Sequence, residues 1–294
     1  MVSVFCITYN HVNFIRDAIE GFLMQETTFP VEIFIHDDAS TDGTADIVRE
    51  YVEKYPKLFW AVLQTENQWS KGNKRIIFSY LTNQRGQFVA HCEGDDYWTD
   101  PRKIEIQWEF LTQNMDYVAT VHDTRDVDQY GNMLHDMGLP LWIAGDSTRE
   151  DLLRTKRVLP IRALMHRNII KKFPHEIENV LNGDNFLWIL LGENGGCKFL
   201  KNIKPSHYRV HNGGVWQNLD QEKVSLELMN TYFWIMRYFS RTNRQGLVDY
   251  YKKLLLKKTW DIASSSQRYD LIFNMIINSL LQILLKLKII LKSV

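Results

Sequence analysis

The sequence predicts an α/β fold with a mostly parallel central sheet, flanking helices and a helical C-terminal extension. Three observations lead to this prediction. Apolar, β-rich runs alternate with helical patterns from Val2 to Cys92, in an order typical of a parallel sheet covered by helices on both faces. Three of the predicted strands end in polar clusters. The composition changes after Trp216, so we expect one α/β domain over residues 1–216 and a helical region over residues 217–294.

The elements of the first half follow from the spacing of apolar side chains. Strands are predicted where β-branched and aromatic residues run together: Val2–Ile7, Val31–His36, Phe59–Leu63 and Phe88–Cys92. Helices are predicted where apolar residues recur at three- and four-residue spacing: Phe14–Leu23, Ala45–Val52 and Ile76–Leu81. Asn13 is the predicted cap of the first helix, and Gly94 is predicted to give the backbone the freedom to turn after the fourth strand.

The second half has a less regular pattern. Its predicted elements are a helix over Ile104–Leu111, a strand over Tyr117–His122, a short helix over Leu152–Arg157 and a helix that follows Asp184. Glycine and proline interrupt residues 123–142, which predicts a long loop or a hairpin there.

Composition and charge narrow the functional classes. The 294 residues include 35 basic and 35 acidic side chains, so the formal net charge is zero and gives no electrostatic reason to expect a nucleic acid partner. Cys6, Cys92 and Cys197 are far apart, which favours buried thiols in a reducing compartment over a disulfide framework or a zinc site. The short apolar run at the start does not have the pattern of a signal peptide, so we expect the protein to face the cytoplasm.

Polar side chains follow the first, second and fourth predicted strands. They are Thr8, Tyr9 and Asn10, then Asp37 and Asp38, then Glu93, Asp95 and Asp96. In a parallel sheet, ligands bind beyond the carboxyl ends of the strands, so these groups are predicted to meet at one edge. Together they suit a nucleotide diphosphate, which they would bind through its base, its sugar and its metal-bridged phosphates. Each cluster alone is also compatible with an ordinary capping turn or surface turn.

The acidic turn HCEGDDYWTD places three carboxylates within four positions. Such a cluster is stabilised when a cation neutralises it. Its hard oxygen ligands predict Mg²⁺ or Mn²⁺ in preference to zinc. An acidic surface turn without a cation is the alternative.

These stretches carry a family resemblance. SVFCITYNH, IFIHDDASTDGT and EGDDYWTDP resemble the sugar-nucleotide-binding half of the inverting family-two glycosyltransferases. The resemblance implies a GT-A type fold, with residues 1–101 binding the nucleotide sugar and residues 102–216 binding the acceptor. It implies that Asp38 contacts the nucleobase, and that Asp95 and Asp96 serve the ribose and the metal. Glu93 stands where many members have aspartate, so its part in metal binding is open.

The resemblance also implies roles in the second half. Asp184 is the predicted base that deprotonates the acceptor hydroxyl in a single displacement with inversion. Its position at a helix start also fits a simple cap, and a helix N-terminus favours the charged carboxylate. In the stretch His207–Trp216, which its Gly-Gly pair predicts to be a mobile loop, Arg209 is expected at the phosphates and His211 at the metal or diphosphate.

The C-terminal region is predicted to be helical from Val224 to Tyr238 and again from Leu271 to Val294. The last helix has a wide apolar face beside lysines, which favours the interface of an anionic membrane. Packing on the α/β domain or on a second copy of the chain is the alternative. We therefore expect a peripheral membrane enzyme that extends a lipid-linked glycan such as an O-antigen or capsule intermediate. A sugar nucleotidyltransferase and a non-catalytic scaffold are the alternatives, and no oligomeric state is predicted.

Overall fold

A computed structural model describes residues 1–135, 137–140, 143–157, 159–214 and 219–266. The chain divides into two compact units, Met1–Asn218 and Leu219–Val294, and each is described by itself. The predicted amphipathic helix Leu271–Val294 lies outside the described residues, as do Val215 and Trp216 at the end of the predicted mobile loop.

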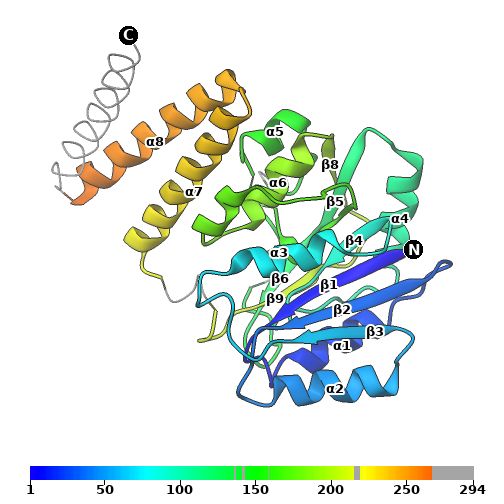
Figure 1. Cartoon of the computed structure of the whole chain (residues 1–294). Coiled ribbons are helices and arrows are strands. Elements are labelled where there is room, and N and C mark those ends of the chain that lie inside the picture. Colours follow the sequence, from blue (N-terminus) through cyan, green and yellow to red (C-terminus); the bar gives the residue numbers. More distant parts are fainter. Residues whose placement is uncertain (136, 141–142, 158, 215–218, 267–294) are drawn as a thin grey trace, which may run out of the picture. The chain divides into compact units, whose positions relative to one another are not determined.

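A seven-stranded sheet in the order β3-β2-β1-β4-β7-β5-β8 forms the centre of the first unit (Figure 1). Its strands are β1 (Val2–Thr8), β2 (Val31–Asp37), β3 (Phe59–Leu63), β4 (Phe88–His91), β5 (Tyr117–His122), β7 (Met165–Arg167) and β8 (Gly196–Leu200). β7 runs antiparallel to β4 and β5, and the other neighbouring pairs are parallel. The predicted mostly parallel sheet is therefore confirmed.

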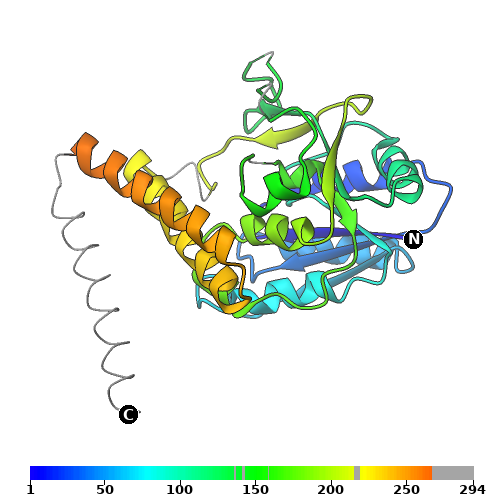
Figure 2. The same cartoon turned by 90° about the horizontal axis from the view of Figure 1, so that it is seen from above.

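Helices cover both faces of this sheet. They are α1 (Ile15–Leu23), α2 (Thr44–Lys54), α3 (Lys74–Thr82), α4 (Lys103–Gln113), α5 (Arg149–Leu153) and α6 (Asp184–Gly192), with the 3-10 turns η1 (Ile161–Ala163) and η2 (His175–Asn179). Figure 2 shows α1 and α4 on one side of β1 and α3 on the other.

The alternation of side chains along the strands explains these two layers. Val4 and Ile35 are fully buried in one core cluster with residues of α1, α2 and α4. Phe34 points to the opposite face, where its ring lies 5.5 Å from that of Tyr80 on α3. Because both faces are covered, the central strands β1, β2 and β4 are buried at nearly every position, as is typical of parallel sheets.

Two predicted helix starts are wrong by a few residues. α1 begins at Ile15, with Phe14 in the N-cap position and no side-chain cap, so Asn13 is not the cap. The helix predicted over Leu152–Arg157 lies instead over Arg149–Leu153. It starts earlier because the side chains of Thr148 and Asp151 form a capping box, in which each accepts a hydrogen bond from the other's backbone N–H.

A separate two-stranded parallel sheet pairs β6 (Thr124–Val127) with β9 (Ser206–Arg209). The first residues of the predicted loop or hairpin over 123–142 therefore form a strand, and the start of the predicted mobile loop His207–Trp216 is also a strand. Tyr97 bridges to His207, which connects this small sheet to the turn after β4. The pairing thus carries Arg209 to the acidic turn.

The second unit contains α7 (Gln221–Arg241) and α8 (Gln245–Ser266). The Asp220 side chain caps α7 by accepting the N–H of Lys223, and the rings of Phe239 and Tyr251 stack between the two helices with centroids 5.9 Å apart. The predicted helix Val224–Tyr238 is thus confirmed and longer than expected. None of the helices in the described part of the chain combines the length and the apolar character needed to cross a bilayer.

Candidate functional site

The polar ends of β1, β2 and β4 meet at one edge of the sheet, as predicted. Thr8 and Asp37 are paired in register at the ends of β1 and β2. The Thr8 carbonyl accepts the N–H of Asp38 at 3.0 Å, and the Ile7 carbonyl accepts the N–H of Gly94 at 2.9 Å. These backbone contacts hold the three clusters together.

Gly94 is required for a reason other than the predicted one. Its φ is not among the positive values in the chain, so the turn does not depend on a left-handed conformation. A Cβ atom at Gly94 would lie 2.6 Å from Oγ1 of Thr8. The absence of a side chain therefore lets the acidic turn approach β1 closely.

Three of the predicted donor-binding residues are engaged mainly in bracing the loops. The Asp37 carboxylate accepts the N–H and the hydroxyl of Ser40. Asn10, at φ 56°, donates its N–H to Ser40 and accepts the N–H of Thr41 through its side-chain oxygen. The Asp38 carboxylate is buried and accepts two backbone N–H groups, from Gln68 at 2.8 Å and from Trp69 at 2.9 Å.

Those contacts determine which of the predicted donor-binding residues remain accessible to a nucleotide sugar. Asp38 fixes the segment that carries Trp69 to the cleft wall, while Asp37 and Asn10 shape the loop edge. Tyr9 is 43% exposed at the same edge, where its ring is open to a flat ligand. Thr8 is buried and its Oγ1 has no hydrogen-bond partner among the described residues.

Asp95 lies between two histidines. Its Oδ2 is 3.1 Å from Nε2 of His211 and 3.7 Å from Nε2 of His11. Burial raises the pKa of this carboxyl, but the hydrogen bond from His211 and the charges of both rings outweigh burial, and the pKa is lowered overall. Asp95 is therefore the acid of the turn that most readily carries a negative charge.

Asp96 is almost completely buried beneath the turn. Its Oδ1 accepts the backbone N–H of Arg209 at 2.9 Å, and its Oδ2 lies 3.4 Å from Nε of Arg162. Burial raises the pKa of Asp96 to about 7. The position of Asp96 is thus fixed by β9 and by the segment before β7.

Arg209 does not present its guanidinium at the open edge. The side chain is 2% exposed, and it pairs with Asp17 of α1 at 2.6 Å. The guanidinium also donates to the carbonyls of Asp95 and Gln129, each at 3.0 Å, and lies over the rings of Phe14 and Tyr97. These contacts favour a structural role that holds the acidic turn, in place of the predicted contact with phosphate.

Glu93, Arg162 and Asp184 line one cleft of about 380 Å³. Burial, then the charges of Asp95 and Asp96, raises the pKa of Glu93 to about 8. Arg162 stacks on Tyr208, with its Cζ 3.9 Å from the ring centroid. The positive charge of Arg162 lowers the pKa of both Glu93 and Asp184, but by less than burial raises each of them.

Asp184 begins α6 but is not its cap. Gly183 occupies the N-cap position without a side-chain hydrogen bond, and Oδ1 of Asp184 accepts the N–H of Asn185 at 3.0 Å. The helix start was expected to lower the proton affinity of this carboxyl. Burial in the cleft instead raises the pKa of Asp184, because the loss of water outweighs the backbone contacts.

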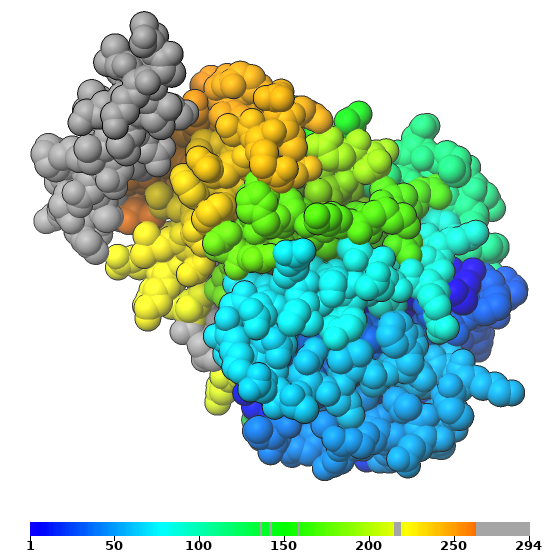
Figure 3. Space-filling view, viewed as in Figure 1, coloured from blue at the N-terminus to red at the C-terminus, as the bar shows by residue number. Residues whose placement is uncertain are grey.

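Gly183 lets α3 close the cleft. A Cβ atom there would lie 2.3 Å from the ring of Phe78, which itself packs on Phe173 with centroids 4.9 Å apart. In Figure 3 the cyan residues of α3 lie directly against the green residues of the second half of this unit. The close packing brings residues more than a hundred positions apart in sequence to one wall.

The acidic turn has the donor set and the unfilled hydrogen-bonding capacity of a cation site. Oδ1 of Asp95 and Oδ2 of Asp96 are buried, and neither has a hydrogen-bond partner within the described ranges. Two overlapping groups have ligand atoms within 4.8 Å of one another: Glu93 with Asp95 and Asp96, and His11 with Asp95 and His211. Buried carboxylate oxygens without donors fit a bound divalent cation.

The raised pKa values predict how pH acts on the cation-free protein. Glu93 and Asp96 favour the neutral form when folded, with pKa values of about 8 and about 7, so their contribution to stability is fully present at low pH. It is lost as pH rises through the folded values, because the unfolded carboxyls ionise at lower pH. With EDTA present, we expect the thermal midpoint to fall as pH rises from about 4, where the unfolded carboxyls ionise, to about 8, and to level off above that.

Scanning calorimetry with EDTA or Mn²⁺ across this pH range checks that expectation. Mn²⁺ should raise the midpoint more at high pH, because ligands must lose protons to bind a metal. The matched variant Glu93→Gln, which cannot ionise, should show a weaker pH dependence with EDTA. A midpoint in EDTA that is independent of pH would contradict the prediction.

Sequence reasoning missed two residues of the site. His11 directly follows Asn10 in the loop after β1, so its position was a signal, but only the structure places its ring at Asp95. Arg162 lies within residues 102–216, which were expected to bind the acceptor, but no role was predicted for its side chain. Its contact with Asp96 depends on β7 pairing with β4, which apolar spacing did not predict.

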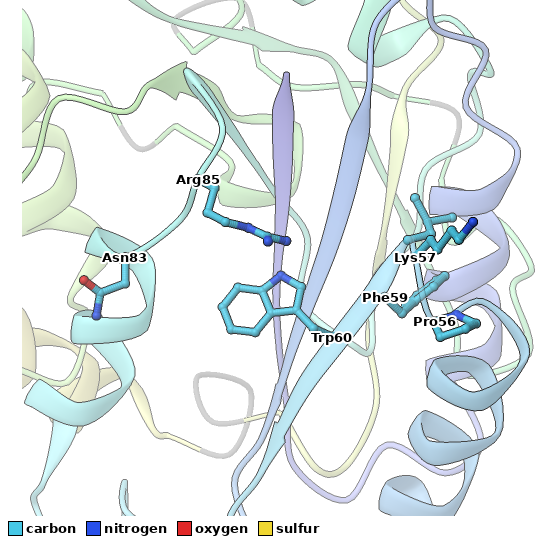
Figure 4. Close-up of a pocket in the computed structure, with 7 residues that line it drawn as sticks. Pro56, Lys57, Phe59, Trp60, Asn83 and Arg85 are labelled. Carbon is cyan, nitrogen blue, oxygen red and sulfur yellow. The ribbon is translucent and has the colours of Figure 1, made fainter.

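A second hollow, of about 410 Å³, lies at the opposite end of the strands. It is lined by residues around the start of β3 and after α3, and Figure 4 shows the Arg85 guanidinium beside the Trp60 indole there. The Arg85 Cζ lies 5.8 Å from the Trp60 ring centroid. None of the residues singled out from the sequence lines this hollow, so we place the functional site at the carboxyl ends.

Comparison with known proteins agrees with this geometry. Residues 3–173 match the model of glycosyl transferase family 2. An uncharacterized protein of Mycobacterium tuberculosis is 33% identical over 227 residues, which are 74% of this chain and 61% of that protein. Escherichia coli chondroitin synthase is 23% identical over 230 residues, covering 72% of this chain and 32% of the synthase.

Among solved structures, a mannosyltransferase from Pyrobaculum calidifontis in complex with GDP-Man and Mn²⁺ superposes with a TM-score of 0.56 at 16% identity. The match covers 96% of this chain and 80% of that one, and at this identity it supports the GT-A fold. The chain spans 61% of the length of the mycobacterial relative. Because the family model covers more than half of its residues, the chain belongs to glycosyl transferase family 2.

Proposed function

We propose that this protein transfers a sugar from a nucleotide diphosphate donor to a hydroxyl group of a glycan acceptor. The observation that carries the proposal is the meeting of the acidic turn and Asp184 at one cleft, with Glu93 and Asp184 among its lining residues. A transferase needs the donor's anomeric carbon and the acceptor's hydroxyl side by side. The solved mannosyltransferase with GDP-Man and Mn²⁺ supports a donor of this class.

The donor lies along the carboxyl ends of β1, β2 and β4 in this proposal. The exposed ring of Tyr9 stacks on the base, while Asp38 and the loop edge formed by Asn10 and Asp37 border the base and ribose. Asp95, His211 and the neighbouring Asp96 hold a divalent cation, Mn²⁺ or Mg²⁺. When bound, that cation supplies positive charge to the departing diphosphate.

Asp184 takes the proton of the acceptor hydroxyl. Its raised pKa makes it a stronger base than an exposed aspartate. The hydroxyl oxygen attacks the anomeric carbon from the face opposite the diphosphate, and the bond to the diphosphate breaks, so a single displacement inverts that centre. Arg162 faces Asp96 at 3.4 Å and lines the same cleft as Asp184, and its positive charge limits the repulsion among these carboxylates.

The acceptor side of the cleft is mostly apolar. Its wall includes Ile77, Phe78, Leu81, Leu159, Ile161, Leu181 and Leu187. Sugar hydroxyls placed against such side chains would lose hydrogen bonds to water without replacing them. An acceptor that joins a sugar to a hydrocarbon avoids this cost, which supports a lipid-linked O-antigen or capsule intermediate. The chondroitin synthase relative is named for a polysaccharide.

We place the protein on the cytoplasmic face of the cell membrane. The support is the sequence pattern of residues 271–294, whose apolar face and lysines suit an anionic surface. A peripheral position would bring the cleft to lipid-linked acceptors. Vesicle co-sedimentation with anionic and with zwitterionic lipids tests this placement.

A polar substitution in the apolar wall should weaken acceptor binding selectively. Leu181 is half-buried at the cleft, so Leu181→Gln is expected to raise the KM for a prenyl-linked acceptor about tenfold, through loss of apolar contact. Steady-state kinetics with the same sugar free and prenyl-linked would measure the effect. Leu134→Gln, at an exposed leucine outside the cleft, is the control. Equal KM changes for the free and linked sugars would count against a lipid-binding wall.

Thermal unfolding against UDP, dTDP, GDP and CMP, with and without Mn²⁺, tests the donor. A nucleotide at about 100 times its Kd adds about 2.7 kcal/mol of stability, which moves the midpoint by several degrees. Product analysis then separates the two enzyme classes: a glycosyltransferase releases a nucleoside diphosphate, and a nucleotidyltransferase releases or consumes pyrophosphate. No shift with any nucleotide would refute the proposal and favour a non-catalytic scaffold.

A further inference from the structure

We propose that His11 is a further protein ligand of the cation at the acidic turn, and that its imidazole makes this site select Mn²⁺ over Mg²⁺. The inference rests on the cation site of the proposed function. It adds a ligand from the loop after β1 to Asp95 and His211.

The geometry of the three side chains suits one ion. Oδ2 of Asp95 faces Nε2 of His211 at 3.1 Å and Nε2 of His11 at 3.7 Å. Ligand atoms bound at about 2.1 Å lie about 3.0 Å apart at a right angle and about 3.4 Å apart at a tetrahedral angle. The observed separations are slightly longer than these values, so small movements of the rings toward Asp95 would complete the site.

A hydrogen bond does not account for the position of His11. Its separation of 3.7 Å from Asp95 is longer than a hydrogen bond between nitrogen and oxygen. Its Nδ1 is buried and has no hydrogen-bond partner in the described part of the chain. The ring therefore can keep its proton on Nδ1 and present the lone pair of Nε2 to a cation without breaking a hydrogen bond.

The backbone holds His11 firmly in place. Its N–H donates to Oγ1 of Thr44 at 2.8 Å, and its carbonyl accepts the N–H of Ile15 at 2.8 Å at the start of α1. Its ring meets that of His211 at 88°, with centroids 5.9 Å apart. The His211 ring packs on Phe14 with centroids 4.7 Å apart. Both imidazoles are thus positioned before any ion arrives, which favours binding.

His211 differs from His11 in one respect. The N–H of Gly213 donates to Nδ1 of His211 at 3.2 Å. Binding of a cation at Nε2 places the ring proton on Nδ1, so the Gly213 amide must move away. Nδ1 of His11 has no such hydrogen-bond partner among the described residues, so His11 is the ligand that needs less rearrangement.

The ligand set determines the choice of ion. Mg²⁺ prefers oxygen ligands and retains its waters, whereas imidazole suits later transition ions. Carboxylates alone would accept Mg²⁺ or Mn²⁺. Two imidazoles beside the carboxylates favour Mn²⁺ over Mg²⁺, and the second imidazole is the contribution of His11.

Pulsed electron paramagnetic resonance of Mn²⁺ tests this directly. The full-length protein, stripped with EDTA, is titrated with Mn²⁺ alone and then with Mn²⁺ plus UDP or GDP. We expect couplings from two imidazole nitrogens in the unmodified protein and from one in His11→Gln. The Mn²⁺ affinity of the variant should fall about tenfold or more. Mutation of residues that only hydrogen-bond to a metal ligand already lowers metal affinity by about that factor.

Competition with Mg²⁺ provides the second measurement. His11→Gln should lower the preference for Mn²⁺ over Mg²⁺, and His11→Asp should retain cation binding while shifting preference toward Mg²⁺. His175→Gln, at an exposed histidine outside the cluster, should change neither property. Circular dichroism melts show whether each variant folds, and His11→Asp keeps the test valid if His11→Gln does not.

Three outcomes would overturn the inference: no Mn²⁺ binding to the unmodified protein under either condition, a single nitrogen coupling in it, or unchanged couplings in His11→Gln. The proposed function is tested separately. Two nitrogen couplings without transfer from any nucleotide sugar would refute the transferase and leave this metal site standing.

Discussion

Replacing Asp184 by asparagine is expected to lower kcat by about 10²- to 10⁴-fold, the contribution typical of a general base. Asparagine has nearly the same shape, but it cannot accept the proton of the acceptor hydroxyl. Asp184 is not the cap of α6, so the helix start should survive the change. Because burial raises the pKa of Asp184, the neutral amide should also leave the folded protein at least as stable.

The decisive comparison is between turnover and donor binding. Asp184→Asn should bind the nucleotide with Mn²⁺ as tightly as the unmodified protein, as measured by calorimetry, while its turnover is lost. The exposed Asp116, in the turn before β5, provides the matched control Asp116→Asn, which should keep full activity. Turnover within threefold of normal in Asp184→Asn would remove Asp184 from the role of base.

The long strands could be predicted because a strand that is buried on both faces consists of a recognisable run of apolar and β-branched residues. Phe59–Leu63 and Tyr117–His122 match the observed strands at both ends. β7 and β9 were not predicted because they contain three and four residues and read MHR and SHYR. Their conformation is set by pairing with β4, β5 and β6, which no local pattern encodes.

In the site, too, some features could be predicted from the sequence and others depend on contacts between distant segments. Parallel pairing brings strand ends together, so the meeting of Thr8, Asp37 and the acidic turn could be deduced from element order alone. The direction in which a long side chain points could not be deduced from element order. Arg209 was expected at the phosphates of the donor, but Asp17 of α1 and two carbonyls determine where its guanidinium points.

Burial also reverses an expectation drawn from local sequence. The start of α6 favours a charged Asp184, yet the cleft formed by α3 and the segment before β7 excludes water and raises the pKa of that carboxyl. Asp95 and Asp96 are adjacent in sequence, but one pKa is lowered by the neighbouring histidines and the other is raised by burial. Each shift depends on groups from distant segments.

That contrast leads to the second large effect, which is expected for Asp95→Asn. Asp95 is the turn acid with a lowered pKa and two imidazoles beside it, so its charge is the one most available to a cation. The variant should lose the stabilisation that a nucleotide with Mn²⁺ gives, about 2.7 kcal/mol at 100 times the Kd. Differential scanning calorimetry would then show almost no shift of the midpoint.

The neighbouring variant Asp96→Asn separates cation binding from support of the turn. An asparagine oxygen at Asp96 can still accept the N–H of Arg209, but the charge facing Arg162 is gone. We expect Asp96→Asn to keep part of the Mn²⁺-dependent shift, because the two histidines and Asp95 remain. If Asp95→Asn retained the full shift and Asp96→Asn abolished it, the cation would belong to the buried acid, and the histidine cluster would lose its central ligand.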